Sequence, residues 1–156
     1  MQHCPWESIY PEEFSKGIDV DEASTLVDII SKSLEVHLDR TAATCLDERI
    51  TYLQLKTYST SLAAYFQSIG LRKGDRVALM MPNSLPYLIA LVGIMKAGMV
   101  VVNVNPLYTP RELEYQLKDS GARCLVVAEQ YVSTFGQVAV NTQVEHVLMS
   151  ASPTFN

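Results

Sequence analysis

The sequence lacks the glycine patterns that hold phosphate groups in many nucleotide sites. Its 156 residues include seven glycines, and no two of them are adjacent. Gly-x-Gly-x-x-Gly and Gly-x-x-x-x-Gly-Lys are both absent, and so is the nucleophile pattern Gly-x-Ser-x-Gly. A phosphate cradle needs glycine where the backbone must approach its ligand. The sequence therefore predicts neither a P-loop, nor a dinucleotide fingerprint, nor a serine hydrolase.

Cysteine and histidine are scarce and scattered. The three cysteines are Cys4, Cys45 and Cys124, and the three histidines are equally far apart. An odd number of widely spaced cysteines favours neither a disulfide framework nor a zinc site, and the histidines match no metal or triad spacing. We therefore predict no metal site in this chain. Cys45 and Cys124 lie in apolar runs and are expected in the core, in a reducing cytoplasm.

Basic residues form no run either. Twelve Lys and Arg residues are outnumbered by 17 Asp and Glu residues, so no nucleic-acid partner is expected. Residues 1–23 show no strong periodicity and no apolar run after a basic start, so they predict an irregular N-terminal arm rather than a secretory leader. Its aromatic residues Trp6, Tyr10 and Phe14 are candidate anchors. Residues 24–156, in a chain that is 48% hydrophobic, are expected to form one α/β subdomain.

One apolar run, residues 85–104, has the length of a membrane span. It contains a single charge, Lys96, but Pro86, Gly93 and Gly98 interrupt it. Its composition also changes at Gly98 from mixed Leu, Ile and Ala to Met and Val. A buried helix followed by a buried strand explains this pattern better than a bilayer helix. Lys96 is expected to extend from the end of that helix toward water.

Helices and strands alternate along the rest of the chain. Helices are predicted at about 25–37, 51–69, 84–98, 109–121 and 130–140, and the starts at Thr25, Thr51 and Thr109 have capping-box patterns. A short hairpin is predicted at 44–51, and strands at 76–81, 99–104, 123–128 and 146–149. This alternation predicts a doubly wound, mostly parallel sheet flanked by helices, with a small N-terminal hairpin.

In an open parallel sheet, ligands bind at the carboxyl ends of the strands. Residues 82–84 and 103–110 each run from a predicted strand end into a helix start, where free backbone N–H groups favour anions. Arg111 in the following first turn adds a positive charge. The alternative is purely structural: Asn and Pro shape turns, Thr109 caps a helix and Arg111 points into water.

Several blocks in the chain resemble a known family. They are residues 73–79 (KGDRVAL), 81–83 (MPN), 96–98 (KAG) and 105–113 (NPLYTPREL). The first three are similar to the N-terminal region of adenylate-forming acyl-CoA synthetases, and the last resembles bacterial long-chain fatty acid–CoA ligases. The resemblance implies part of the large N-terminal domain of an adenylate-forming enzyme. It also implies the reaction: ATP and a fatty acid give an acyl-adenylate, and coenzyme A converts this to acyl-CoA and AMP, with magnesium accompanying ATP.

The resemblance also limits what this chain is expected to do. The family's Ser/Thr/Gly-rich loop ending in Lys, its Tyr-Gly-x-Thr-Glu segment and its catalytic lysine are absent. The resemblance therefore makes no residue of this chain catalytic. The chain alone is expected to be inactive and to bind none of these cofactors tightly. In related enzymes the loop corresponding to Asn105, Pro106 and Leu107 lies near the coenzyme A nucleotide, which makes this loop and Arg111 candidate contacts. The family's basic residues have no clear counterpart, because Tyr131-Val-Ser133 stands about where one would fall.

The resemblance further implies fatty acid and coenzyme A as substrates, a peripheral contact with the inner membrane and a homodimer formed through the N-terminal region. The rival interpretation is a stand-alone interaction module that keeps the fold without the chemistry. The two interpretations predict different surfaces. A part of a larger domain should expose apolar residues where the remainder packs, whereas a stand-alone module should not.

Overall fold

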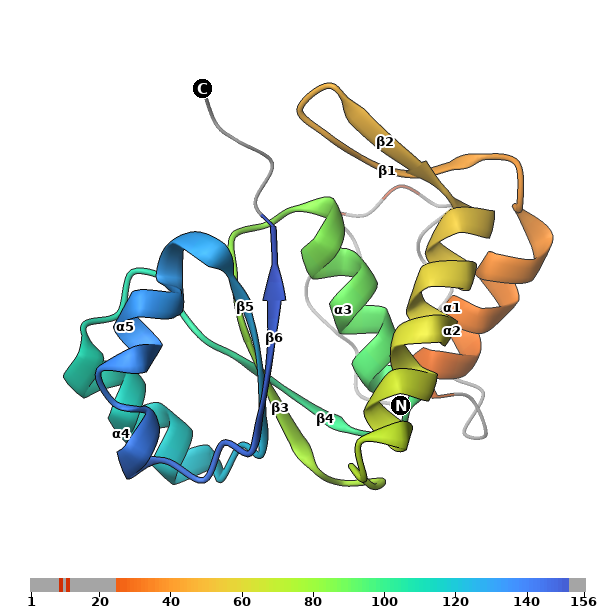
Figure 1. Cartoon of the computed structure of the whole chain (residues 1–156). Coiled ribbons are helices and arrows are strands. Elements are labelled where there is room, and N and C mark those ends of the chain that lie inside the picture. Colours follow the sequence, from red (N-terminus) through yellow and green to blue (C-terminus); the bar gives the residue numbers. More distant parts are fainter. Residues whose placement is uncertain (1–8, 10, 12–24, 152–156) are drawn as a thin grey trace.

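The computed structural model describes Ile9, Pro11 and residues 25–151. The predicted arm at 1–23 lies outside the described residues except for Ile9 and Pro11. Figure 1 shows a central sheet with α1, α2 and α3 on one side and α4 and α5 on the other. Each side has its own apolar cluster against the sheet, one containing Phe66 and Ile94, the other Leu113 and Leu117. This confirms the predicted three-layer α/β arrangement.

The sheet contains β3 (Arg76–Met80), β4 (Val100–Asn103), β5 (Cys124–Ala128) and β6 (His146–Ser150). Their order is β4-β3-β5-β6, and all three neighbouring pairs are parallel. The chain moves from β3 to β4 in one direction and then returns past β3 to β5 and β6. The doubly wound topology predicted from the alternation of elements is therefore confirmed.

Burial differs between central and edge strands. Every residue of β5 and the last four residues of β3 are buried, because helices cover both faces of these two strands. The edge strands β4 and β6 are only partly covered, and Val147 and Met149 of β6 are exposed. The buried strand expected at the end of the long apolar run is therefore wrong for β4, because β4 is an edge strand whose outer side has no neighbour among the described residues.

Three helices begin at the capping boxes that the sequence predicts. They are α1 (Leu26–Val36), α2 (Tyr52–Ser68) and α4 (Pro110–Ser120), capped by Thr25, Thr51 and Thr109. In each, the threonine hydroxyl accepts from the N3 backbone N–H while the N3 side chain accepts from the cap backbone. Gly121 ends α4 in the left-handed conformation, with φ of 61°.

The long apolar run folds as α3 (Leu85–Lys96) followed by β4, as the sequence indicates. Gly93 lets α3 approach α2 closely, since a Cβ there would lie 3.1 Å from the Ser59 carbonyl oxygen. Lys96 reaches out of the helix end, and its Nζ donates to Thr60 Oγ1 at 2.7 Å. Partial burial lowers the pKa of Lys96. None of the helices in the described ranges is long and apolar enough to cross a membrane.

The helix predicted at 130–140 is confirmed only in part, because the α-helix there covers five residues. The segment instead forms a 3₁₀ turn at Glu129–Tyr131, the short helix α5 (Val132–Gly136) and a second 3₁₀ turn at Ala139–Asn141. No side chain caps α5. Gly136 interrupts the segment, and several β-branched residues lower its helix propensity. These local features explain why the α-helix is shorter than the predicted one.

The hairpin comprises β1 (Thr41–Cys45) and β2 (Glu48–Thr51), and β1 begins three residues earlier than predicted. Leu46 turns the chain with φ of 54°. Ile50 of β2 joins Leu34 of α1 and Val92 of α3 in a third apolar cluster. Cys124 is buried, which raises its pKa to about 12 and confirms it as a core residue. Cys45 is only half-buried, because the hairpin covers one face alone.

An ion-pair cluster lies at the amino end of the sheet. Arg123 contacts Asp75 at 2.7 Å and Glu145 at 2.6 Å, which links the segments that precede β3, β5 and β6. The backbone N–H of Arg72 donates to Asp75 at 2.8 Å. That hydrogen bond, with the positive charge of Arg123, lowers the pKa of Asp75 below its ordinary value of 3.8.

This lowered pKa predicts a specific acid response. A carboxyl group with a lower pKa in the folded state stabilises the protein above pH 3.8, and that contribution is lost as the pH falls through the folded-state pKa. We expect Asp75→Asn to lower stability at pH 7 and to flatten the loss of stability below pH 3.8. Urea unfolding between pH 7 and pH 2 measures both effects. The control is Asp119→Asn, which changes an exposed carboxylate on α4 and should leave the loss of stability in acid as in wild type. If the two variants lost stability equally in acid, Asp75 would not be the group responsible.

Candidate functional site

The carboxyl ends of the four parallel strands lie at one edge of the sheet, opposite the ion-pair cluster. Residues 81–84 leave β3 at this edge, residues 104–109 leave β4, and the turn at 129–131 leaves β5. Open parallel sheets bind their ligands beyond this edge. The sequence-predicted site residues Asn105, Pro106, Leu107 and Arg111 all lie in the connection after β4 and in the first turn of α4.

Asn105, Pro106 and Leu107 form a tight turn. The Asn105 side-chain oxygen accepts from the Leu107 backbone N–H at 3.0 Å, and the Asn105 carbonyl accepts from the Tyr108 N–H at 3.1 Å. Asn at the first position and Pro at the second favour this geometry. Leu107 is left exposed at the tip. The structure thus shows the turn-forming role of these residues directly, while their predicted contact with coenzyme A stays a prediction.

Asn103, the last residue of β4, fixes the start of this connection. Its side-chain oxygen accepts from the Tyr87 hydroxyl at 3.0 Å, and its backbone carbonyl accepts from Gln116 Nε2 at 2.8 Å. Tyr87 belongs to α3 and Gln116 to α4, so one residue ties the edge strand to a helix on each face. The sequence analysis missed all three residues. The signal available was an Asn that ends a run of three valines, together with a Gln between the buried residues Leu113 and Leu117.

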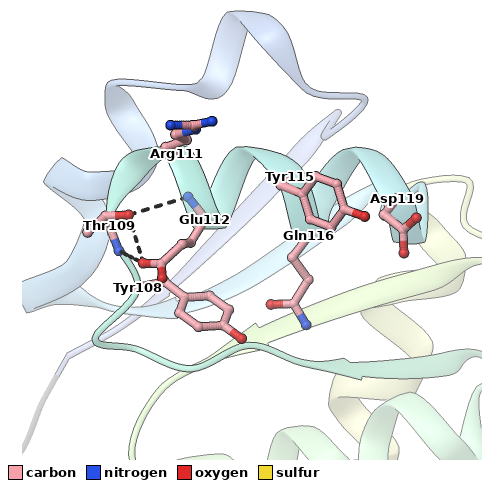
Figure 2. A pocket seen from close by; sticks show the side chains of 7 residues that line it. All are labelled: Tyr108, Thr109, Arg111, Glu112, Tyr115, Gln116 and Asp119. Atoms are coloured by element: carbon pink, nitrogen blue, oxygen red, sulfur yellow. Dashed lines mark hydrogen bonds between the residues drawn. The ribbon is translucent and has the colours of Figure 1, made fainter.

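The N-terminus of α4 already holds an anionic side chain. The Glu112 carboxylate accepts from the Thr109 N–H at 2.9 Å and from the Thr109 hydroxyl at 2.7 Å, as Figure 2 shows. Both hydrogen bonds lower the pKa of Glu112, and the one from the hydroxyl contributes most. Because Glu112 already neutralises the positive end of the helix dipole, the helix start offers an incoming phosphate little attraction. A phosphate contact here would therefore depend on Arg111.

A groove of about 650 Å³ runs along α4. Its lining residues are Tyr108, Thr109, Arg111, Glu112, Tyr115, Gln116 and Asp119. Among these seven described residues, Arg111 is the single basic one, and it lies with the carboxylates of Glu112 and Asp119. Figure 2 shows Gln116 within this set, and its Oε1 is buried without a hydrogen-bond partner among the described residues. The groove thus combines two aromatic rings with one buried acceptor that lacks a donor.

The strand order places a second candidate region beside this one. The order in which strands are added to the sheet reverses between β3 and β5, because β4 lies on one side of β3 while β5 and β6 lie on the other. Ligands in doubly wound sheets bind at such a point. The segments that meet there are residues 81–84 and 129–133, which include Tyr131-Val-Ser133. Asn105 and Arg111 lie one strand away, beyond β4. In the described ranges, no group of three His, Cys, Asp or Glu side chains is placed to hold a metal ion.

Comparison with known proteins identifies the family that has this fold. Residues 30–154 match the family model described as AMP-binding enzyme. The chain belongs to the AMP-binding enzyme family. It is 47% identical over 146 residues to a long-chain-fatty-acid–CoA ligase of Escherichia coli O6:H1, a match that covers 93% of this chain and 26% of that protein. A long-chain-fatty-acid–CoA ligase of Bacillus subtilis is 37% identical over 80% of this chain and 22% of its own length.

Solved structures of this family share the fold. An anthranilate CoA ligase in complex with anthranoyl-AMP aligns with a TM-score of 0.76 and 29% identity, over 80% of this chain and 24% of that one. A long-chain-fatty-acid-CoA ligase from Archaeoglobus fulgidus aligns with a TM-score of 0.74 and 28% identity, over 82% and 27% of the two chains. The resemblance found in the sequence blocks is confirmed. The chain spans about a quarter of the length of the curated relatives it matches.

The double anchoring of Asn103 generates a prediction. Gln116→Ala removes the donor to the Asn103 carbonyl, and we expect a loss of about 1 kcal/mol in unfolding free energy, the usual net value of one hydrogen bond. We also expect faster amide exchange at Leu107 and Tyr108, because the connection loses its anchor. Urea unfolding and hydrogen exchange measure the two effects. Gln67→Ala, an exposed position on α2, is the matched control. If exchange in the turn were the same in both variants, Gln116 would have no anchoring role.

Proposed function

We propose that this chain forms part of a long-chain fatty acid–CoA ligase. The complete enzyme would convert ATP and a fatty acid to an acyl-adenylate and pyrophosphate, and then transfer the acyl group to coenzyme A with release of AMP. The observation that carries the proposal is 47% identity over 93% of the chain to a ligase of that name. Acid–thiol ligase chemistry is thus assigned to the complete protein, of which this chain would supply a part.

The surface of the sheet supports this interpretation over a stand-alone module. Val147 and Met149 are exposed on β6, and Val100 is exposed on β4. Apolar residues on both outer strands are expected where further parts of a larger domain pack. They are not expected on a sheet that is finished at these edges. The described part of the chain would then serve as the scaffold on which the ATP and acyl sites are assembled.

The residues present fit the three cofactors unequally. The chain lacks a glycine-rich loop for the ATP phosphates, and its described part lacks a cluster of ligands for magnesium. Neither group is therefore assigned to residues of this chain. The turn Asn105–Leu107 together with Arg111 offers one exposed guanidinium beside a rigid turn, which fits a single phosphate of coenzyme A. When bound, coenzyme A supplies the thiol that accepts the acyl group.

We also propose a cytoplasmic setting with peripheral contact at the inner membrane. Support comes from the substrate class alone, because long-chain fatty acids partition into membranes. Homodimer formation through the N-terminal region stays a prediction, since that region lies outside the described residues apart from Ile9 and Pro11.

A chimera tests the proposed activity. The 156 residues would replace the matching quarter of the Escherichia coli relative, and acyl-CoA formation from ATP, palmitate and coenzyme A would be assayed. We expect activity within about tenfold of the parent, a change of roughly 1.4 kcal/mol in the barrier. The 156-residue chain alone should show none. A control chimera with Leu125→Asp in the buried strand should be inactive. A folded, ATP-binding chimera that forms no acyl-CoA would contradict the proposal.

The same chimera tests the coenzyme A contact. Losing a charge-assisted hydrogen bond should raise the KM for coenzyme A about tenfold in Arg111→Ala, with the KM for ATP unchanged. Arg72→Ala is the matched control, since Arg72 is an exposed arginine next to the opposite edge of the sheet. An unchanged KM for coenzyme A in the Arg111 variant would remove the contact and leave the ligase assignment intact.

A further inference from the structure

The side chain of Lys96 is held by hydroxyl groups rather than by a carboxylate. Its Nζ donates to Thr60 Oγ1 at 2.7 Å and to Ser59 Oγ at 3.4 Å, and both hydroxyls belong to α2. Lys56 and Lys118 are paired with glutamates, whereas Lys96 forms no ion pair with any carboxylate of the described residues. The amine is therefore held in place without a counter-charge.

The two hydroxyls can only accept hydrogen bonds from Lys96. Ser59 Oγ donates to the Lys56 carbonyl at 3.2 Å, and Thr60 Oγ1 donates to the same carbonyl at 2.7 Å. A hydroxyl has one proton to donate, so each turns a lone pair toward the Lys96 Nζ. An uncharged amine has two N–H groups and one lone pair. With both N–H groups donated to α2, the lone pair of Lys96 faces away from that helix and is available to an electrophile.

The surroundings of Lys96 also favour this uncharged form. Partial burial lowers the pKa of Lys96, and the positive charge of Lys56 lowers it further. Glu35 of α1 lies 3.9 Å from the Lys56 amine and offsets part of that charge. Lys96 itself is only partly buried, so a reagent in solution can reach it.

The other charges near this end of α3 do not reverse the effect. The C-terminal end of a helix favours a cation, but the last carbonyls of α3 already accept from backbone N–H groups that follow the helix. Lys73 packs the aliphatic part of its side chain against Gly98, two residues after Lys96. As a second cation it acts in the same direction as Lys56.

We propose that Lys96 is a site of acylation by acyl thioesters of coenzyme A. The Nζ lone pair attacks the thioester carbonyl carbon, the C–S bond breaks, and the coenzyme A thiolate leaves and takes up the proton that the nitrogen loses. The product is an uncharged amide with one N–H in place of two, so one of the two α2 hydroxyls loses its donor. The inference rests on the proposed function only in that the complete ligase would supply such thioesters.

The position of Lys96 separates this reaction from the candidate site. Lys96 precedes β4 by four residues, so it lies at the amino edge of the sheet, whereas the turn Asn105–Leu107 follows the carboxyl end of β4. The reactivity of Lys96 therefore comes from the contacts of its own amine and not from coenzyme A held at that turn. Acetyl phosphate, which has no coenzyme A part, should acylate the same lysine first.

Acetylation of the 156-residue chain tests the site. The chain is incubated with acetyl-CoA at pH 8, and mass spectrometry of its peptides gives a rate constant for each lysine. We expect Lys96 to react about tenfold faster than the exposed lysines Lys32, Lys73 and Lys118, since a pKa lowered by one unit gives about tenfold more free amine. In concentrated urea the difference should disappear, because it depends on contacts of the folded state.

Variants of the neighbouring ion pair test the cause. Lys56→Gln removes the nearby positive charge and should slow acetylation of Lys96 about twofold, as expected for a surface charge. Glu35→Gln leaves Lys56 unpaired and should speed acetylation about twofold. The matched control is Lys118→Gln, which removes another lysine paired with a glutamate, on α4, and should leave the Lys96 rate unchanged.

Three results would overturn the proposal. They are a Lys96 rate equal to that of the exposed lysines, a preference for Lys96 that persists in urea, and a Lys96 rate that is the same in Lys56→Gln, Glu35→Gln and the control. Each would leave the ligase assignment untouched, because the acetyl donor is supplied and the assay needs no ligase activity.

Discussion

The parallel pairing of β3 with β5 is the interaction on which the rest of the structure depends. Val77 to Met80 pair with Cys124 to Val127, and all of these residues are buried. Side chains on one face of this pair pack against α2 and α3, and those on the other face pack against α4. Helices on both sides are thus held by the same two strands. The ion pairs of Arg123 with Asp75 and Glu145 fix the segments that enter the sheet at its amino end.

The candidate site follows from what this core leaves open. In the described part of the chain, β4 pairs with a strand on one side only. Its last residue, Asn103, is instead anchored by hydrogen bonds from Tyr87 and Gln116. The turn Asn105–Leu107 is therefore presented rigidly at the carboxyl edge of the sheet. Glu112 already occupies the start of α4, which leaves Arg111 as the residue able to attract a phosphate. The proposed coenzyme A contact rests on that single charge and on the rigidity of the turn.

The sequence predicts most elements because local signals agree with tertiary packing. The three capping boxes, Gly121 after α4 and the apolar runs of β3 and β5 all behave as local rules require. It overestimates the helix at 130–140, where Gly136 and the lack of a capping side chain leave only the five-residue helix α5 between two 3₁₀ turns. It also cannot distinguish central from edge strands, because Val100–Val102 and Val126–Val127 look alike until the strand order is known.

The site was predictable only in part, for a related reason. Asn105, Pro106 and Arg111 have sequence signals that belong to turns and helix starts. The roles of Tyr87, Asn103 and Gln116 depend on contacts between residues 13 and 16 positions apart, which no local pattern reveals. The exposed side of α1 was likewise hidden, since Leu26, Ile29 and Leu34 form one apolar stripe in the sequence and only Leu34 is buried in the structure.

The central claim is that this sheet is one part of a larger adenylate-forming domain. Amide hydrogen exchange along β6 tests it most directly, measured in the 156-residue chain and in the chimera with the Escherichia coli relative. We predict that residues 147–150 exchange much more slowly in the chimera, because the added sequence covers β6, while β5 exchange stays similar. Equal rates in β6 would contradict the account, since they would show that nothing packs on this edge in the complete domain.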